Sequence, residues 1–367
     1  MPRFLRFLAS MLFAILSYNS AFAQSEPTPF RVAIAGLTHG HVAGFLSSAA
    51  KRADIQIVGI AEPDQQLAHR YADQFKLDSR LLYTDLDQML AAVKPQAILA
   101  YTNTRDHRRV VEIAARHHIP VMMEKPLAVS VDDALAMKRA ADAGHIPVLV
   151  NYETTWYPNN AAIYKLLQDG ALGDIRKVVI HDGHNGPKEI GVPPEFLDWL
   201  TDPVRNGAGA LFDFGCYGAD LTTGLMHGEA PTTVTAVLQT MKPQIYPRVD
   251  DEATVILTYP KAQAILQASW NWPFGRKDME VYGETGQAIT VGRDSIRLRR
   301  KDDNEEHAQT TPPLPSPYDD SISYLIAVVS GKIQPSGPSA LDTNIIVVRI
   351  LDAARESAKT GKTITLH

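Results

Sequence analysis

From residue 30 to residue 151, short apolar runs alternate with longer amphipathic stretches. The apolar runs, which are typical of buried strands, lie at 32–35, 55–61, 97–101, 121–123 and 148–150. The stretches between them repeat apolar residues with the period of a helix, at 42–53, 65–75, 86–93, 107–117 and 131–143. Because strands and helices that alternate at this spacing form right-handed βαβ units, the pattern predicts an α/β domain with a parallel sheet over residues 30–151.

Polar residues and a glycine mark three helix ends in this region. Asp85 and Ser130 precede helical stretches, and their side chains are expected to cap the first turns by accepting backbone N–H bonds. Gly144 follows the last stretch and is expected to close that helix, because glycine is the residue that most often ends helices.

The pattern changes after residue 157. Helices are expected at 159–168, at about 208–226, at 321–330 and at 343–360. Short segments rich in β-branched and aromatic residues lie at 178–181, 233–239, 253–259, 264–272, 279–282, 295–299 and 363–366, and tight turns such as 283–286 separate them. Residues 152–367 are therefore predicted to form an α+β domain with a large open, mainly antiparallel sheet, whose C-terminal helix packs back on the first domain.

The first 23 residues have the composition of a signal peptide. Arg3 and Arg6 precede an apolar stretch at 7–16, and Ala21-Phe22-Ala23 resembles a cleavage site. The apolar stretch is shorter than the roughly 20 residues of a membrane-spanning helix. We therefore expect export by a Sec-type signal to the periplasm or the medium, with an uncleaved anchor as the alternative.

Composition limits the kinds of partner. The chain has 367 residues, 45% of them hydrophobic, and a formal net charge of −5, so it can form two cores and has no basic stripe for nucleic acid. No second long apolar run follows the signal, so no membrane attachment is expected after cleavage. Cys216 is the one cysteine, which excludes an intramolecular disulfide, and we interpret it as a small core residue.

A glycine turn follows the first predicted strand. That strand breaks at Gly36 before a helix, which places backbone N–H groups where a pyrophosphate is stabilised. The G-x-G-x-x-G spacing is imperfect, because Thr38 and His41 take the second and third glycine positions, although Gly40 still permits a close approach. Glu62 ends the second strand, where a carboxylate binds ribose hydroxyls and repels a 2′-phosphate. These residues predict NAD rather than NADP; the alternative for Glu62 is an exposed helix cap.

A lysine and an aspartate–tyrosine pair carry the candidate chemistry. Glu124-Lys125-Pro126 follows a predicted buried strand, and this places Lys125 at the carboxyl edge of a parallel sheet, where such sheets bind ligands. Asp213 and Tyr217 are four residues apart on a predicted helix, so their side chains share one face.

Several segments together resemble the Gfo/Idh/MocA family, which includes glucose-fructose oxidoreductase and inositol dehydrogenase. The resemblance rests on residues 101–103 with His107, on 124–126, on 207–217 and on a tail from 344 to 362, so it covers nearly the whole chain after the signal. It implies a Rossmann domain that binds a nicotinamide dinucleotide and a second domain that binds a sugar or polyol. Many members have histidine where this chain has Tyr217, and tyrosine there is similar to glucose-fructose oxidoreductase and dihydrodiol dehydrogenase.

The resemblance implies a role for each catalytic candidate. Tyr217 would be the acid/base, Lys125 its positioner and electrostatic partner, and Asp213 the orienter. Because a tyrosine normally titrates near 10, we expect the ammonium of Lys125 to favour the phenolate and lower that pKa. The alternative is a hydrogen-bonded core tyrosine beside a surface aspartate.

The remaining candidates follow from the same resemblance. The expected cofactor-binding residues are Gly36, Thr38, His39, Gly40, His41, Glu62, Thr102, Asn103, His107, Glu124 and Lys125. The expected substrate-binding residues are Asn151, Trp156, His184 and Lys188, and His107 has a helix cap as its alternative. His181, Asp182 and His184 have no spacing specific for a metal, so no metal site is expected. Trp270 and Trp272 could stack on a sugar or pack between subunits.

Three functions fit these residues. The first is an NAD-dependent oxidoreductase that transfers a hydride between a sugar or polyol hydroxyl and tightly bound nicotinamide. The second is a redox-neutral cleavage of a glycoside by oxidation, elimination and re-reduction. The third is a carbohydrate-binding protein without activity, whose glycine turn has changed at Thr38 and His41. An exported enzyme must keep and regenerate its NAD, and the family implies a homo-oligomer formed through the open C-terminal sheet.

Overall fold

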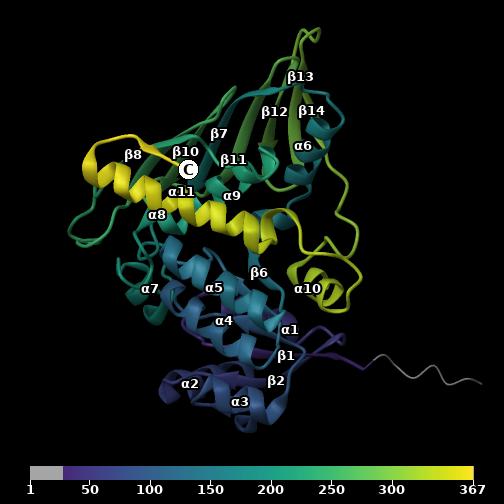
Figure 1. Cartoon of the computed structure of the whole chain (residues 1–367), viewed down its shortest axis with the longest axis vertical. Coiled ribbons are helices and arrows are strands. Elements are labelled where there is room, and N and C mark those ends of the chain that lie inside the picture. Colours follow the sequence, from purple (N-terminus) through teal and green to yellow (C-terminus); the bar gives the residue numbers. More distant parts are fainter. Residues whose placement is uncertain (1–27, 367) are drawn as a thin grey trace, which may run out of the picture.

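The computed structural model describes residues 28–366, in which two sheets lie one above the other with helices between them (Figure 1). The predicted signal peptide, residues 1–23, lies outside the described residues. Within residues 28–366, no helix combines the length and the apolar composition that crossing a bilayer requires.

The first sheet is parallel throughout, as predicted. Its strands are β1 (Phe30–Ala35), β2 (Ile55–Ala61), β3 (Leu82–Tyr83), β4 (Ala97–Ala100), β5 (Val121–Glu124) and β6 (Val148–Asn151). They lie in the order β3-β2-β1-β4-β5-β6, with every neighbouring pair parallel. The order reverses between β1 and β4, which is the point where doubly wound sheets bind ligands. The pattern did not predict β3, because two residues show no periodicity.

The helices of this domain are α1 (His41–Ala49), α2 (Gln65–Phe75), α3 (Leu86–Val93), α4 (His107–Arg116) and α5 (Val131–Gly144). Both predicted caps are confirmed: Asp85 accepts a bond from Gln88 N–H and Ser130 from Asp133 N–H. The prediction for Gly144 is wrong, because α5 includes Gly144 and its left-handed end residue is His145. Gly144 serves packing instead, since a Cβ there would lie 2.7 Å from the Ala115 carbonyl oxygen of α4.

The second sheet is mixed but mainly antiparallel, as predicted. Its strands are β7 (Ile175–Gly183), β8 (Thr233–Gln239), β9 (Glu252–Thr258), β10 (Gln263–Ser269), β11 (Arg276–Gly283), β12 (Gly286–Val291), β13 (Ser295–Arg300), β14 (His307–Thr310) and β15 (Ile364–Thr365). They lie in the order β14-β13-β12-β11-β7-β10-β9-β8-β15, in which β7 and β10 are parallel and the other pairs antiparallel. The sequence pattern did not predict β12 or β14, and β14 lacks apolar alternation because it is exposed throughout.

The helix predicted at 208–226 is two helices, α8 (Ala210–Asp213) and α9 (Gly215–Leu225), which meet at Phe214. The break has a local reason, because the carbonyl oxygen of Asp213 accepts a hydrogen bond from Lys125 Nζ at 2.7 Å instead of continuing the helical ladder. The predicted single helix is therefore divided into two helices, and the break lies directly after the catalytic candidate Asp213.

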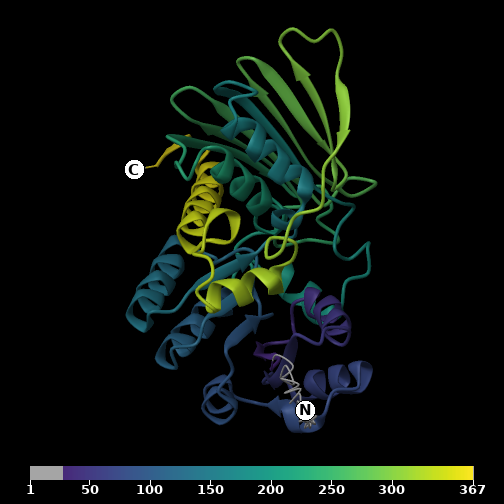
Figure 2. The same cartoon turned by 90° about the vertical axis from the view of Figure 1, so that its right-hand side faces the viewer.

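Helices cover one face of the large sheet and connect it to the first domain. Those that contact the large sheet are α8, α9, α6 (Pro158–Gln168) and α11 (Leu341–Thr360). The other helices are α7 (Pro194–Leu200) and α10 (Ser321–Val329), and the short turns are η1 (Ser79–Leu81), η2 (Thr104–Asp106), η3 (Glu153–Trp156) and η4 (Gly337–Ser339). α11 lies between the two sheets and contacts β8, α9 and α5, and α10 joins the core around β1 (Figure 1). None of the described helices covers the opposite face of the large sheet (Figure 2), and Val237 and Ile256 are exposed apolar residues in β8 and β9.

The carboxylate of Asp220, on α9, gives a test of this core. Asp220 is fully buried, and neither of its oxygens has a hydrogen-bond partner among residues 28–366. Burial raises the pKa of the carboxyl well above its ordinary value. Because the folded state then binds this proton more tightly than the unfolded state, the free energy of unfolding falls as pH rises above about 4. We predict that Asp220→Asn is more stable than the wild type at pH 8, by about 1–3 kcal/mol, and equally stable near pH 4. Urea unfolding at both pH values measures this, and equal stability at pH 8 would contradict it.

Candidate active site

Two cavities lie along the carboxyl edge of the first sheet. The larger, here called the catalytic cavity, has a volume of about 590 Å³ and lies between the domains. Its lining includes Gly40, His41, Lys125, Glu153, His184, Phe196, Asp213, Tyr217 and Lys277. The smaller, here called the nucleotide cavity, has a volume of about 150 Å³ and is lined by residues that include Gly36, Thr38, Glu62, Thr102 and Asn103. The catalytic cavity therefore brings together residues of both domains that lie far apart in the sequence, such as Lys125 and Asp213.

A buried ion pair between the domains forms the floor of the catalytic cavity. Lys125 Nζ, which follows β5, donates to Asp213 Oδ1 at 2.6 Å and to the Asp213 carbonyl oxygen. Trp270 Nε1 donates to Asp213 Oδ2 at 2.9 Å. Burial opposes the ionised forms, but the pair overcomes it: Lys125 holds the pKa of Asp213 at about 2, and Asp213 raises the pKa of Lys125. Trp270 therefore orients Asp213 and is fully buried, which fits neither role considered for it from the sequence.

Tyr217 lies beside this pair with 1% of its surface exposed. Burial raises the pKa of Tyr217 well above its ordinary value, so the expected lowering by Lys125 is wrong in direction. Two features explain the difference. Lys125 Nζ lies 4.9 Å from the centroid of the tyrosine ring, and its charge is paired with Asp213.

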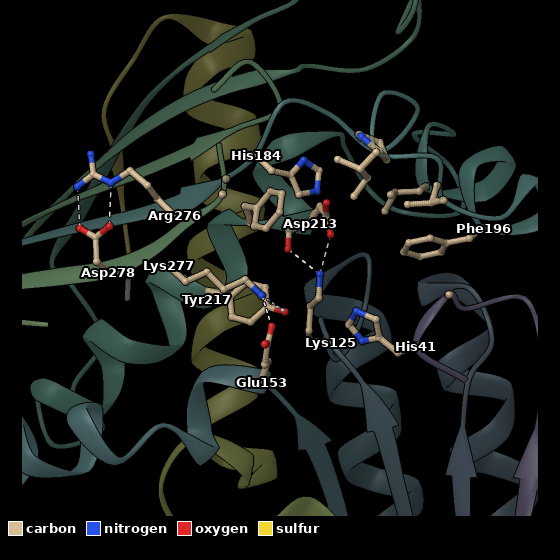
Figure 3. A pocket seen from close by; sticks show the side chains of 18 of the residues that line it. His41, Lys125, Glu153, His184, Phe196, Asp213, Tyr217, Arg276, Lys277 and Asp278 are labelled. Atoms are coloured by element: carbon tan, nitrogen blue, oxygen red, sulfur yellow. Dashed lines mark hydrogen bonds and ion pairs between the residues drawn. The ribbon is translucent and has the colours of Figure 1, made fainter. Parts of the chain in front are cut away.

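The cation closest to the Tyr217 hydroxyl is Lys277, which the sequence analysis missed. Lys277 Nζ lies 3.5 Å from Tyr217 Oη and 4.5 Å from the ring centroid (Figure 3). It forms an ion pair with Glu153 of η3, and Glu153 also pairs with Arg293. Lys277 lies two and four residues before the buried Met279 and Val281 of β11, and so on the same face of the strand. This two-residue period is a signal that could have placed the lysine on the inward face.

A chain of hydrogen bonds runs away from the cavity behind the glycine turn. His41 Nδ1 donates to Glu124 Oε2 at 3.0 Å, Asn151 Nδ2 donates to Glu124 Oε1 at 3.0 Å, and Trp156 Nε1 donates to Asn151 Oδ1 at 2.9 Å. Burial opposes ionisation of Glu124, but His41 and Asn151 hold the pKa of its carboxyl at about 2. Asn151 and Trp156 were expected to bind substrate, yet neither lines the catalytic cavity, because their side chains hold Glu124 from behind.

The other predicted contacts fall in several places. His184 lines the catalytic cavity, and burial lowers the pKa of its ring. Lys188 is exposed and does not line the cavity. His107 is buried, with Nδ1 3.1 Å from the Pro126 carbonyl oxygen, so it supports the loop after Lys125 and lines neither cavity.

His39 is buried next to His41 and lines neither cavity. Its ring centroid lies 4.6 Å from that of His41, and both rings have a ligand atom within 4.8 Å of a Glu124 oxygen. These are residue types that bind metal ions, but the direct bond between His41 and Glu124 already pairs two of the three.

The nucleotide cavity has the features that a dinucleotide requires. Gly36 has φ +80°, and a Cβ there would lie 2.6 Å from Thr102 Cγ2, so only glycine fits this close approach between β1 and β4. Glu62 is buried at the end of β2 and accepts bonds from Leu37 N–H at 2.8 Å and Asp64 N–H at 2.9 Å. Asn103 lines the cavity and also caps η2. These residues fit the adenosine half of NAD.

A parallel sheet that binds nucleotide at its switch point, joined to an α+β domain across a cavity that holds a buried ion pair, defines a two-domain dinucleotide-dependent protein. Residues 30–152 match the model of an oxidoreductase family with an NAD-binding Rossmann fold, and residues 160–289 match the GFO/IDH/MocA C-terminal domain. The two matches together cover more than two thirds of the chain, which therefore belongs to the Gfo/Idh/MocA family of oxidoreductases.

Relatives and solved structures agree with this assignment. The chain is 25% identical to D-apiose dehydrogenase of Rhizobium rhizogenes over 84% of this chain and 90% of that protein. It has the fold of aldose-aldose oxidoreductase from Caulobacter crescentus complexed with glycerol, at 22% identity, TM-score 0.78 and coverage of 92% and 100%. It also has the fold of an inositol dehydrogenase homologue from Azotobacter vinelandii complexed with NAD⁺, at 19% identity, TM-score 0.79 and coverage of 92% and 98%. The predicted fold, enzyme class and cofactor are thereby confirmed.

The Lys125–Asp213 pair can be tested by stability. Asp213→Asn leaves a buried ammonium without its counter-charge, and we expect the free energy of unfolding at pH 7 to fall by about 3–5 kcal/mol. Because the folded pKa of Asp213 is depressed to about 2, the difference from the wild type should shrink as pH falls from about 5 towards 2. Urea unfolding across this range measures it.

Asp169→Asn is the matched control, since it removes a carboxylate from the exposed Lys165–Asp169 pair on α6. It should change the stability at pH 7 by less than about 1 kcal/mol. If both variants lose the same small amount, the buried pair does not have the assigned role.

Proposed function

We propose that this protein is an NAD-dependent oxidoreductase that transfers a hydride between a hydroxyl of a sugar or polyol and bound NAD. The observation that carries the proposal is the position of Tyr217 and the Lys125–Asp213 pair in one cavity with the glycine turn of the NAD-binding domain. In Figure 3, Lys125 stands between Tyr217 and His41 of that turn. The names of relatives, which include D-apiose dehydrogenase and inositol 2-dehydrogenase, support a substrate with several hydroxyls.

Tyr217 is proposed as the group that moves the proton. Its raised pKa keeps the phenol protonated at neutral pH, so in the reductive direction Tyr217 gives its proton to the carbonyl oxygen of the substrate. Lys277 Nζ faces the hydroxyl oxygen of Tyr217, and its charge stabilises the phenolate that remains after the transfer. In the oxidative direction the phenolate takes the proton of the substrate hydroxyl. Bound NAD supplies the hydride acceptor or donor.

Lys125 is proposed to position the substrate. An ammonium group has three N–H donors, and Lys125 uses two of them on the carbonyl and carboxylate oxygens of Asp213. The third donor is available to an oxygen of the substrate in the catalytic cavity that Lys125 lines. Asp213 fixes the direction of that donor, in agreement with the orienting role expected from the sequence.

The charges in the catalytic cavity favour an uncharged substrate. Each lysine and arginine among the described residues that line it is paired with a carboxylate: Lys125 with Asp213, Lys277 and Arg293 with Glu153, and Arg276 with Asp278. An acidic sugar would have to compete with these pairs, whereas a neutral polyol uses the remaining donors and acceptors.

The preference for NAD over NADP rests on Glu62. Its carboxylate lines the nucleotide cavity and is held by two backbone N–H groups, where it can bind ribose hydroxyls and would repel a 2′-phosphate. We further propose export to the periplasm, from the signal-like residues 1–23, and a homo-oligomer that covers the exposed Val237 and Ile256 of the large sheet.

The first test is the cofactor content of the purified protein. We predict that denaturation releases NAD, not NADP, in stoichiometric amount, and that the loaded protein then oxidises or reduces a sugar or polyol from a neutral panel. Mass spectrometry of the released nucleotide and of the sugar products measures both. A protein that contains no NAD and binds none when it is added would contradict the proposal, and NADP would contradict the role of Glu62.

Product analysis also separates the two enzymatic functions. A glycoside that is cleaved without any net change in the redox state of the cofactor would replace the proposed reaction by the redox-neutral one. Oxidation of one sugar coupled to reduction of another would support the proposed one.

The role of Lys277 gives a second test. Lys277→Met removes the ammonium at the Tyr217 hydroxyl and leaves Glu153 paired with Arg293, so the fold should persist. We predict at least a tenfold lower kcat with little change in KM, and a shift to higher pH of the limb of the rate profile that Tyr217 controls, because the phenolate loses its counter-charge. Lys277→Arg should keep most of the activity, and Lys165→Met on the surface of α6 should match the wild type. An unchanged pH profile in Lys277→Met would rule out this role.

A further inference from the structure

The segment that contains α7, residues 193–206, extends from the second domain and packs on the glycine turn of the first. Trp199 Nε1 donates to the Thr38 carbonyl oxygen at 3.1 Å, and the ring centroids of Phe196 and His39 lie 4.7 Å apart. The contact at Gly40 is equally close, since a Cβ there would lie 2.9 Å from Phe196 Cδ1. Both aromatic rings are buried, so this is a packed interface.

The same segment is also fixed to the two neighbouring connections. On one side, Glu195 pairs with Arg70 at 2.7 Å and accepts a bond from Tyr71 Oη at 3.1 Å, both on α2. On the other side, the Arg205 carbonyl oxygen accepts a bond from Arg105 N–H at 3.0 Å, and Thr104 Oγ1 donates to Asn206 Oδ1 at 3.3 Å, both on η2.

These anchors surround the switch point. The glycine turn follows β1, α2 follows β2 and η2 follows β4, so the segment contacts each of the three connections at the carboxyl ends of these strands. Connections at this edge are the ones that surround a dinucleotide in a doubly wound fold. The segment therefore crosses the carboxyl edge of the first sheet at its switch point.

The two cavities are lined by residues of the same turn beneath this crossing. Thr38 lines the nucleotide cavity, and Gly40 lines the catalytic cavity. A dinucleotide that occupies both must pass the turn from Thr38 to Gly40, which Trp199 and Phe196 cover. Phe196 lies on the His41 side of the catalytic cavity (Figure 3).

We infer that Phe196, Trp199 and Glu195 are cofactor-retaining residues that close the NAD site from the second domain and hold the nucleotide between turnovers. This rests on the proposed function, which requires bound NAD. Entry or loss of the nucleotide requires the segment to lift, which breaks the Trp199–Thr38 bond and exposes two buried rings. Glycines with positive φ flank the segment, Gly191 at +73° and Gly207 at +100°, and they are the natural pivots for this movement.

The experiment measures nucleotide exchange, which needs no substrate. The full protein is loaded with NAD and transferred into an excess of isotopically labelled NAD, and the bound nucleotide is identified by mass spectrometry over time. We expect Trp199→Phe, which removes the indole N–H and keeps a ring, to exchange at least tenfold faster than the wild type. Phe196→Ala should exchange faster still, and Glu195→Gln should accelerate exchange by weakening the anchor on α2.

Trp272→Phe is the matched control, because Trp272 is partly exposed next to His181 on the large sheet and lines neither cavity. It should exchange at the wild-type rate. Circular dichroism and thermal unfolding of each variant without nucleotide show whether it folds. If Phe196→Ala does not fold, Glu195→Gln still tests the proposal, because it alters only a side chain that pairs with the exposed Arg70.

The outcomes separate the two proposals. A wild-type protein that binds no NAD overturns the proposed function, and the retaining role with it. If the wild-type protein binds NAD but exchanges it as fast as the folded variants Trp199→Phe and Glu195→Gln, the retaining role is overturned. The proposed function then still stands.

Discussion

The buried pair of Lys125 and Asp213 is the contact on which the arrangement of the site depends. Each side chain comes from a different domain, and neither can remain charged in the interior without the other, because an isolated buried ion costs several kcal/mol. Lys125 also donates to the carbonyl oxygen of Asp213, directly at the break between α8 and α9. The pair therefore couples the docking of the domains, the break between α8 and α9, and the position of Tyr217 one turn further along the chain.

The surroundings of Tyr217 divide two effects that the sequence could not separate. The family resemblance implies that an ammonium lies near the tyrosine, and from this we expected a lowered pKa for Tyr217. In the structure burial is the larger effect, and the charge of Lys125 is already balanced by Asp213. Lys277 is the cation at the hydroxyl end of the ring. A site built this way keeps a proton on the phenol and stabilises its loss only where the negative charge forms.

Local patterns predicted what short stretches of sequence determine. Most strands and most helices follow from periodicity. Lys125 follows from an edge position, and Asp213 and Tyr217 from a four-residue spacing. The pattern along β11 could place Lys277 on the inward face of its strand, but the meeting of Lys277 and Glu153 with Tyr217 depends on the pairing of the large sheet. Asn151 does not line the catalytic cavity for the related reason that a side chain at a strand end can point to the cavity or behind it, and Trp156 of η3 bonds to Asn151 there. The register of a strand sets this, and the register depends on tertiary pairing.

The position of Phe196 connects cofactor retention with the reaction itself. Its ring packs on Gly40 of the nucleotide turn and also lines the catalytic cavity. A substrate in the cavity and a dinucleotide under the turn would therefore contact the same side chain. The redox-neutral cleavage returns the cofactor to its starting state within one turnover, and the proposed oxidoreductase does so when the oxidation of one sugar is coupled to the reduction of another. A fold that closes over the turn while it leaves the catalytic cavity open is suited to such a cycle, because substrates can exchange while the cofactor stays.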